Sequence, residues 1–230
     1  NSCEIFKKEA GKKMVFMGKI SDTQMGAVAL NGNTFFVVLK NSLYKGDVNN
    51  LKSKPELKEI TVPLNKNERI DTIYVHPENP HRMYLYGFKM LCVSNDSGES
   101  WVARKKIPAI SKIFFHPKKQ DRLIIKSFNN LYISEDGGEN IELLDIKIKY
   151  DPRVLFDYTN ELRFLIMDSK SIYETVDNGK TFVKKGEIEF EKRNGNSVIV
   201  QDAVIKPDNG SVTYLATNLG IYKSVDSGMT

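Results

Sequence analysis

The sequence predicts an all-β fold, and within that class part of a β-propeller built from four-stranded antiparallel blades. Three observations lead to this prediction. A seven-residue motif recurs along the chain at intervals of 40 to 49 residues. Short apolar strands precede each copy in the same arrangement, and no stretch keeps the 3.6-residue apolar period of a helix. A repeat of this length accommodates one four-stranded blade, and successive blades of this kind favour a β-propeller.

Composition places the chain among globular proteins. It has 230 residues, of which 40% are hydrophobic and 27% charged, so it can bury a core and does not resemble a disordered or collagen-like chain. The net charge is +5, but the basic residues are scattered. A nucleic-acid partner is therefore not predicted, because such binders gather basic residues on one face. No apolar run approaches the roughly 20 residues of a membrane-spanning helix.

The recurring motif, called the box below, reads Ser/Thr-x-Asp-x-Gly-x-Ser/Thr/Asn. Its copies begin at Ser94, Ser134, Thr175 and Ser224, which lie 40, 41 and 49 positions apart. A large apolar residue follows the first three copies. A degenerate copy at 43–50 keeps the apolar lead-in and lacks the Asp-x-Gly. We expect blades to end near these turns, at 46–50, 94–101, 134–141, 175–182 and 224–230.

Each box has the composition of a tight turn. The glycine supplies a positive φ, the aspartate and the first hydroxyl bond backbone N–H groups, and the apolar residue begins the next strand with a side chain to bury. We therefore predict a structural role for the box. Its residues are Ser94, Asp96, Gly98 and Trp101; Ser134, Asp136, Gly138 and Ile141; Thr175, Asp177, Gly179 and Phe182; and Ser224, Asp226 and Gly228.

The strands before each box follow a fixed plan. Two apolar segments separated by a small turn precede every copy, and an earlier strand ends 18 residues before the box. The residues at that offset are His76, His116, Asp157 and Lys206. Eighteen residues hold two short strands and their turns. Strand, turn, strand, hairpin, strand, box, strand is one blade, whereas a β-sandwich or a β-helix gives no reason for a constant offset.

The box is identified as the Asp-box, or BNR repeat, of sialidases, xyloglucan-degrading glycosidases, photosystem assembly factors and VPS10 sorting receptors. It identifies a propeller type and no activity. The stretch 91–138 is more specific: with its Ile113–Pro117 segment and the strand Asn130–Ser134 before the second box, it resembles the VPS10 domain of sortilin-type receptors. The segment Thr34–Leu39 followed by Ser42–Lys45 is similar to the opening blade of that domain.

The resemblance implies that residues 1–230 are the N-terminal part, about five blades, of a ten-bladed ring. A cysteine-rich module, a membrane span and a cytosolic tail would follow, and the chain is expected to be truncated because it stops inside a box. The implied function is a receptor that binds peptide or protein cargo in the lumen of the Golgi and endosomal system, for transport to the endosome and the lysosome or vacuole. No catalysis and no cofactor are implied, and the ligand-binding residues stay unknown.

Two other functions remain open. One is an Asp-box glycoside hydrolase or carbohydrate-binding propeller of the sialidase or xyloglucanase type, and the other is an assembly factor with the same repeats. Arg82 and Arg122 occupy equivalent places in successive blades, which predicts strand-edge surface positions rather than a converging arginine triad. Paired carboxylates would be needed for glycoside hydrolysis, with Asp71 and Asp157 as candidates. His76 and His116 are predicted to be structural.

Modification sites and cysteines complete the candidates. The sequons at Asn95 and Asn209 lie in predicted turns, where a lumenal protein could carry glycans. Cys3 and Cys92 are the two cysteines, and whether they form a disulfide is left open. Neither they nor the three histidines have the spacing of a metal site.

Overall fold

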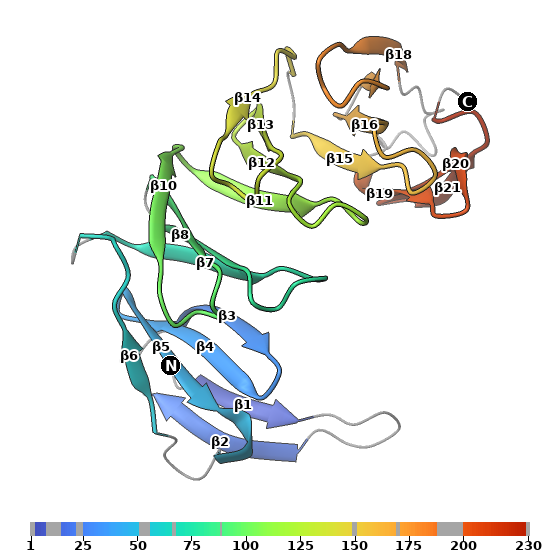
Figure 1. The fold of residues 1–230 in the computed structure, drawn as a ribbon. Coiled ribbons are helices and arrows are strands. Elements are labelled where there is room, and N and C mark those ends of the chain that lie inside the picture. The colour runs from blue at the N-terminus through green and yellow to red at the C-terminus, as the bar shows by residue number, and fades with distance from the viewer. Residues whose placement is uncertain are drawn as a thin grey trace. The chain divides into compact units, whose positions relative to one another are not determined.

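The computed structural model describes residues 3–7, 15–21, 25–50, 56–65, 68–87, 89–148, 151–168, 171–187 and 200–228, with the backbone alone for 3–7, 15–21 and 25. These residues form antiparallel sheets joined by turns (Figure 1). The one helical element among them is a 3-10 turn at Val48–Asn50. Within the same ranges, no helix is long and apolar enough to cross a membrane.

The strands group into five blades, which we name A to E, and one separate strand pair. Blade A holds β3 (Met25–Asn31), β4 (Thr34–Leu39), β5 (Ser42–Asp47) and β6 (Lys58–Ile60). Blade B holds β7 (Ile70–Val75), β8 (Met83–Gly87), β9 (Met90–Ser94) and β10 (Val102–Lys106). Blade C holds β11 (Ile110–Phe115), β12 (Leu123–Ser127), β13 (Asn130–Ser134) and β14 (Glu142–Leu143). Blade D holds β15 (Arg153–Phe156), β16 (Phe164–Met167), β17 (Ser171–Thr175) and β18 (Val183–Glu187). Blade E holds β19 (Val200–Lys206), β20 (Asn209–Thr217) and β21 (Gly220–Ser224), while β1 (Cys3–Lys7) pairs with β2 (Val15–Ser21).

The predicted blade plan is confirmed. In blades A to D the four strands pair in sequence order, each antiparallel to the next, and the three strands of blade E do the same. First strands end directly before His76, His116 and Asp157, and Lys206 is the last residue of its own first strand. The chain is thus part of a β-propeller of four-stranded antiparallel blades.

Two turns set the boundaries of the strands that follow them. β16 begins at Phe164, because Leu162 and Arg163 belong to the preceding turn. The hairpin turn between β12 and β13 is formed by Phe128 and Asn129, and Asn130 pairs with Ser127 as the first residue of β13.

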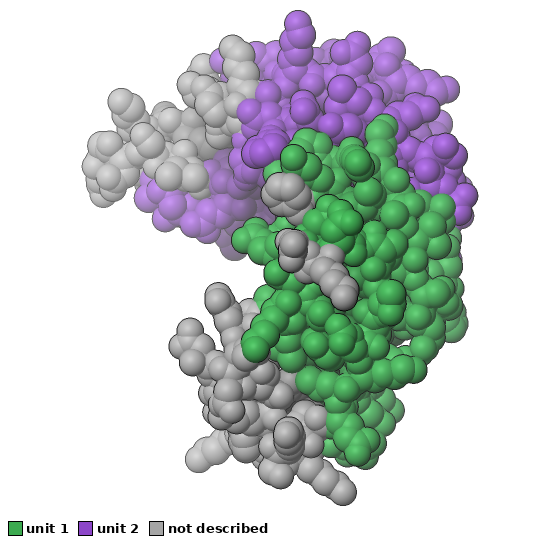
Figure 2. Space-filling model, turned by 90° about the vertical axis from the view of Figure 1, so that its left-hand side faces the viewer, with its two compact units in different colours: residues 1–109 green, residues 110–230 purple. Residues whose placement is uncertain are grey.

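The chain divides into two compact units, residues 1–109 and 110–230 (Figure 2). Unit 1 contains blades A and B, and unit 2 contains blades C, D and E. Each unit has a core of its own, so each is described by itself.

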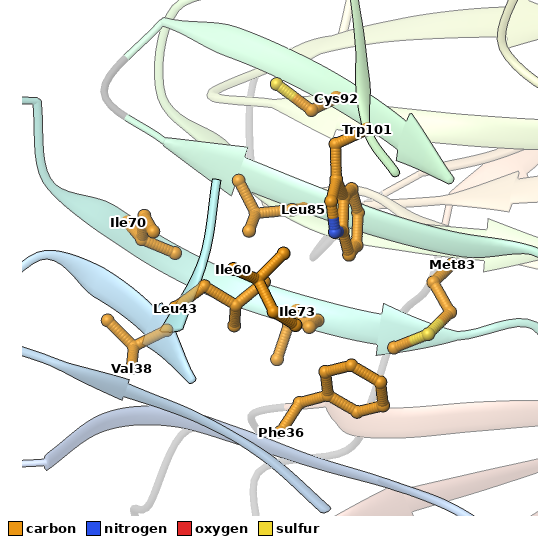
Figure 3. Packing of buried hydrophobic residues seen from close by; sticks show 10 residues of the cluster. All are labelled: Phe36, Val38, Leu43, Ile60, Ile70, Ile73, Met83, Leu85, Cys92 and Trp101. Atoms are coloured by element: carbon orange, nitrogen blue, oxygen red, sulfur yellow. The ribbon is translucent and has the colours of Figure 1, made fainter. Parts of the chain in front are cut away.

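The core of unit 1 lies between the sheets of blades A and B (Figure 3). Phe36 and Leu43 from blade A meet Met83, Leu85 and Cys92 from blade B, and all five side chains are buried. Trp101, the apolar residue after the first box, joins the same cluster. Burying a side chain of this size contributes roughly 1.5–3 kcal/mol, so the cluster supplies much of the stability of the unit.

Unit 2 repeats this packing twice. Leu131 of blade C packs with Phe156 and Phe164 of blade D, and Ile172 of blade D packs with Ile205 and Leu215 of blade E. The two inner strand residues Leu131 and Ile172 occupy the same position, three residues before a box, and both are buried. A repeated sequence position therefore becomes a repeated contact between neighbouring blades.

Candidate functional site

The boxes form closed hydrogen-bonded turns. In the first, the Ser94 hydroxyl accepts the Gly98 N–H at 2.8 Å and donates to Asp96 Oδ1 at 2.8 Å. Asp96 Oδ1 also accepts the Ser100 N–H at 2.9 Å. The second and third boxes repeat these bonds with Asp136 and Asp177, and the fourth repeats the first two with Asp226.

These bonds set the charge state of the aspartates. Burial raises the pKa of Asp96, but the hydrogen bonds from Ser100 and Ser94 outweigh it and lower that pKa to about 2. The bonds from Thr181 and Thr175 lower the pKa of Asp177 to about 2. A carboxylate that its own turn keeps ionised has no proton to donate near neutral pH. Such a charge state suits a structural role better than acid catalysis.

The box glycines meet two requirements. Their φ angles are positive as predicted, for example +84° at Gly98 and +84° at Gly179, and the residue before each box glycine also has a positive φ. In addition, a Cβ on Gly98 would lie 2.6 Å from the ring of Phe36 in blade A, and one on Gly228 would lie 2.6 Å from Ile172 in blade D. The box glycine therefore also lets the preceding blade approach, which the turn chemistry alone does not predict.

The apolar residues after the boxes differ in burial. Trp101 and Ile141 are buried, and the Trp101 Nε1–H donates to the Gly98 carbonyl at 3.2 Å. Phe182 is half-buried and packs edge-on against Phe164. Blade A lacks the box, and its turn runs through the 3-10 residues Val48–Asn50 instead, with Asn49 N–H bonded to Asp47.

In blades B, C and D the residue 18 positions before the box closes the turn after the first strand. His116 Nδ1 accepts the N–H groups of Lys118 and Lys119 at 3.1 and 3.0 Å, and His76 does the same for Glu78 and Asn79. Asp157 Oδ1 accepts the Thr159 N–H at 2.7 Å. Both histidines are buried and bonded to their own turn, which agrees with the predicted structural role.

Arg122 corrects the sequence prediction of a surface position. Its side chain is buried, and it joins blade C to blade D by donating to the Glu161 carbonyl at 2.5 Å. Arg163, at the same position in blade D, donates to the Gly210 carbonyl of blade E at 2.8 Å. Recurrence at a fixed offset was the right signal, but it marks a clamp between neighbouring blades rather than an exposed strand edge.

The clamp around Arg163 lines a polar cleft between blades D and E, which is our candidate site. The cleft measures about 590 Å³, a volume within the range of small-ligand sites. Arg163 contacts Asp157 at 2.6 Å, Glu174 at 2.7 Å and the Ser227 hydroxyl at 2.7 Å. The remaining lining residues are Thr159, Asn160, Asp208, Asn209, Gly210 and Ser211.

The two cleft carboxylates that bond Arg163, Asp157 and Glu174, are held ionised. Burial raises the pKa of Asp157, but the hydrogen bonds from Thr159 and Arg163 outweigh it, so the pKa lies below its ordinary value. The pKa of Glu174 is likewise lowered, because bonds from Arg163 and Lys185 exceed the effect of burial. Asp71, the other carboxylate candidate, pairs with Arg69 at 2.5 Å in unit 1. Asp71 and Asp157 belong to different units and form no described pair.

The cysteines and the sequons stand apart from the cleft chemistry. Cys92 is a buried free thiol, and burial raises its pKa to about 12. The side chain of Cys3 lies outside the described residues. Asn95 is exposed but accepts a bond from Arg82 Nε at 3.1 Å, whereas Asn209 is exposed at the start of β20 and accepts the Ser211 N–H at 3.0 Å. Among the residues that the structure describes, no group of three His, Cys, Asp or Glu is placed to hold a metal.

Comparison with known proteins shows the fold and no family. No model of a protein family matches the chain, and no curated protein matches it either. The chain is similar to an ancestral GH74 enzyme, with a TM-score of 0.56 and 16% identity over 85% of this chain and 27% of that one. It is similar to a GH74 xyloglucanase from Xanthomonas campestris, with a TM-score of 0.55 and 13% identity over 89% and 37% of the two chains. It is also similar to YCF48 bound to a D1 peptide, with a TM-score of 0.52 and 14% identity over 90% and 67%. This chain thus spans only 27–37% of the length of these GH74 enzymes, and at such identities the likeness concerns the propeller fold alone.

Proposed function

We propose that this chain is a binding module without catalytic activity, the ligand-binding part of a sortilin-like sorting receptor for extended peptide or protein cargo in the Golgi and endosomal lumen. The observation that carries the proposal is the set of open strand edges. The first strands β3, β7, β11, β15 and β19 each stand at the end of their sheet, so one edge of each pairs with no strand of the described chain. An extended peptide binds by adding to such an edge.

Two further observations support a binding role. Of the three carboxylates that line the cleft, Asp157 and Glu174 bond Arg163 and Asp208 bonds Lys206. The pKa of each is lowered, whereas a glycosidase acid needs a raised pKa, so the cleft suits a clamp better than acid catalysis. The fold also accommodates peptides elsewhere, because the similar protein YCF48 was solved with one. The resemblance to VPS10 domains adds the receptor role and the lumenal location, and the net charge of +5 favours acidic cargo.

Peptide titration tests the proposal. We would measure fluorescence anisotropy of a labelled acidic 12-residue peptide with the 230-residue chain, beside a basic peptide of the same length. Acidic peptide is expected to bind at least tenfold more tightly, with an affinity that falls as salt rises. N-methylation of alternate peptide amides should abolish binding in one register and spare it in the other, because strand addition uses every second N–H. Equal binding of both N-methylated peptides would rule out edge addition.

A glycoside hydrolase or carbohydrate-binding propeller is the second candidate, favoured by the similarity in fold to GH74 enzymes. It predicts release of reducing ends from xyloglucan, lost in the Glu174→Gln variant. Peptide binding without any xyloglucan hydrolysis or binding supports the first candidate. Xyloglucan hydrolysis that Glu174→Gln abolishes would replace it with the second.

A further inference from the structure

We propose that Phe128, at the tip of the β12–β13 hairpin in blade C, is an anchor that inserts into an apolar pocket of a protein partner. This contact is separate from the open strand edges and does not depend on them. It rests on two independent properties of one residue, its backbone conformation and its exposure.

The backbone at Phe128 is in a conformation that suits glycine. Phe128 and Asn129 form a two-residue turn between the paired residues Ser127 and Asn130, and the φ of Phe128 is +52°. Two-residue hairpins that need a positive φ at this position favour Gly, Asn or Asp, and a bulky side chain is strained there. The corresponding turn of blade A also has positive φ angles but uses Lys40 and Asn41.

The side chain of Phe128 is not buried, so burial does not offset this strain. Phe128 is 65% exposed, and it belongs to neither of the two apolar clusters described above for unit 2. Tyr158 is the other exposed large aromatic residue of the described chain, and it is less exposed. The unfavourable backbone conformation and the exposed aromatic ring each lower the stability of the isolated chain. Both features are typical of a contact residue that is stabilised by its partner.

The sequence repeats the feature once. Phe88 stands six residues before the first box, as Phe128 stands six residues before the second. Phe88 lies outside the described residues. At position 128, glycine would satisfy the turn and remove the ring.

The surroundings of the tip favour a protein over a membrane surface. Asn129 and Asn130 beside the ring are exposed and uncharged. Lys126 on the same strand is bonded to Asp151, whose side chain is 70% exposed, and Lys112, which pairs with Lys126 on β11, lies over the ring of Phe114. An anionic lipid surface would require free basic residues around the ring. An aromatic ring framed by neutral amides matches an apolar pocket with a polar rim, as at the centre of protein interfaces.

The first arm of the test measures stability. Phe128→Gly relieves the strain and should raise the midpoint temperature by about 2 °C or more, whereas Phe128→Ala keeps the positive φ on a Cβ and should not raise it. A lower midpoint for Phe128→Gly would mean that the ring packs on the fold, and it would overturn the proposal.

The second arm measures binding with a defined probe, a displayed library of cyclic 12-residue peptides selected on the wild-type chain. The selected peptides should lose at least tenfold in affinity on Phe128→Gly and Phe128→Ala and keep it on Phe128→Trp. Val183→Ala removes an equally exposed apolar side chain from blade D and should leave the affinity unchanged. Selected peptides that bind all variants equally would overturn the proposal. Co-sedimentation of the wild-type chain, but not of Phe128→Gly, with phosphatidylcholine and phosphatidylserine vesicles would also overturn it, in favour of a membrane contact.

Discussion

The junctions between blades C and D and between blades D and E share one hydrogen bond from an arginine to a carbonyl, but they differ in the residue beside it. In both, an arginine twelve residues before a box donates to the backbone carbonyl fourteen residues before the next box. At the C–D junction a second side chain contacts the same carbonyl: His116 Nε2 lies 3.3 Å from the Glu161 carbonyl oxygen. At the D–E junction the same position holds Asp157, which forms an ion pair with Arg163.

The comparison shows that the residue after the first strand of one blade limits which residue the next blade can place opposite it. Glu161 and Gly210 occupy equivalent positions opposite His116 and Asp157. A Cβ on Gly210 would lie 2.7 Å from the carboxyl carbon of Asp157, so the carboxylate occupies the space where a side chain would begin. The histidine junction leaves room for a glutamate. Asp157 with Gly210, and His116 with Glu161, are therefore matched pairs, and their exchange can be tested.

Removal of the charged clamp should have the largest effect. Arg163→Met leaves Asp157 buried without its cation, and breaking a buried ion pair from one side costs about 3–5 kcal/mol. Urea unfolding followed by far-UV circular dichroism measures the change. A loss below about 1 kcal/mol would contradict the assignment of Arg163 as the main clamp, because surface ion pairs account for such values.

Filling the space at Gly210 should come next. Gly210→Ala forces a Cβ against the Asp157 carboxylate, and overpacking of this kind costs about 2 kcal/mol. The double variant Asp157→His with Gly210→Glu copies the residue pair of the C–D junction into the D–E junction. It should be more stable than the single variant Gly210→Ala. If the double variant is less stable, the two junctions are not interchangeable and the matching rule is wrong.

The same arginine deletion at the C–D junction should cost less. Arg122→Met loses the bond to the Glu161 carbonyl, but its carboxylate partner Glu135 is 50% exposed on its side chain and stays hydrated. We expect a loss of about 1–2 kcal/mol, the range of a lost hydrogen bond. The same unfolding assay applies, and a loss equal to that of Arg163→Met would show that the buried carboxylate adds nothing to the clamp.

A pH titration should give the smallest effect and separate the junctions by their ionisable groups. Burial and the charge of Arg122 lower the pKa of His116 below 6.5, against the weaker opposing effects of Glu161 and Glu135. The unfolded chain then binds a proton more readily, so stability falls as pH drops below 6.5. The lowered pKa of Asp157 has an effect of the same sign at lower pH: its stabilising contribution persists until pH falls below about 3.8 and is then lost.

His116→Asn is the matched control for this titration, because its amide oxygen can still accept the turn N–H groups without binding a proton. The midpoint temperature of the wild type should fall between pH 7 and 5 by more than that of the variant. Parallel pH profiles would show that His116 does not contribute to the acid sensitivity.

Sequence reasoning reached the blade plan because its signals are local. A turn that needs Gly98 at a positive φ, with Asp96 and Ser94 bonded inside it, follows from the chemistry of seven residues. The contacts between blades did not follow. Arg122 was expected at the surface, since nothing in the neighbouring sequence indicates that a carbonyl 39 residues later accepts its bond.

The candidate cleft was predicted only in fragments. Asp157 was recognised both as a strand end and as a carboxylate candidate, yet its link to Arg163, Glu174 and Gly210 depends on how two blades meet. The exposure of Phe128 was missed for a related reason, because apolar residues in a strand-turn-strand pattern are expected to be buried. Such distances and exposures arise from tertiary packing and leave no signal at a fixed spacing in the sequence.

Trp101 gives the molecule an optical label in one half only. It is the single tryptophan of the chain, it is buried in unit 1, and its indole N–H is bonded to the box carbonyl of Gly98. Excitation at 295 nm therefore selects the melting of blades A and B, while unit 2 contributes nothing to that emission. Comparing its red shift with the loss of backbone ellipticity would reveal, without any labelling, whether the two halves melt as one cooperative body or in succession.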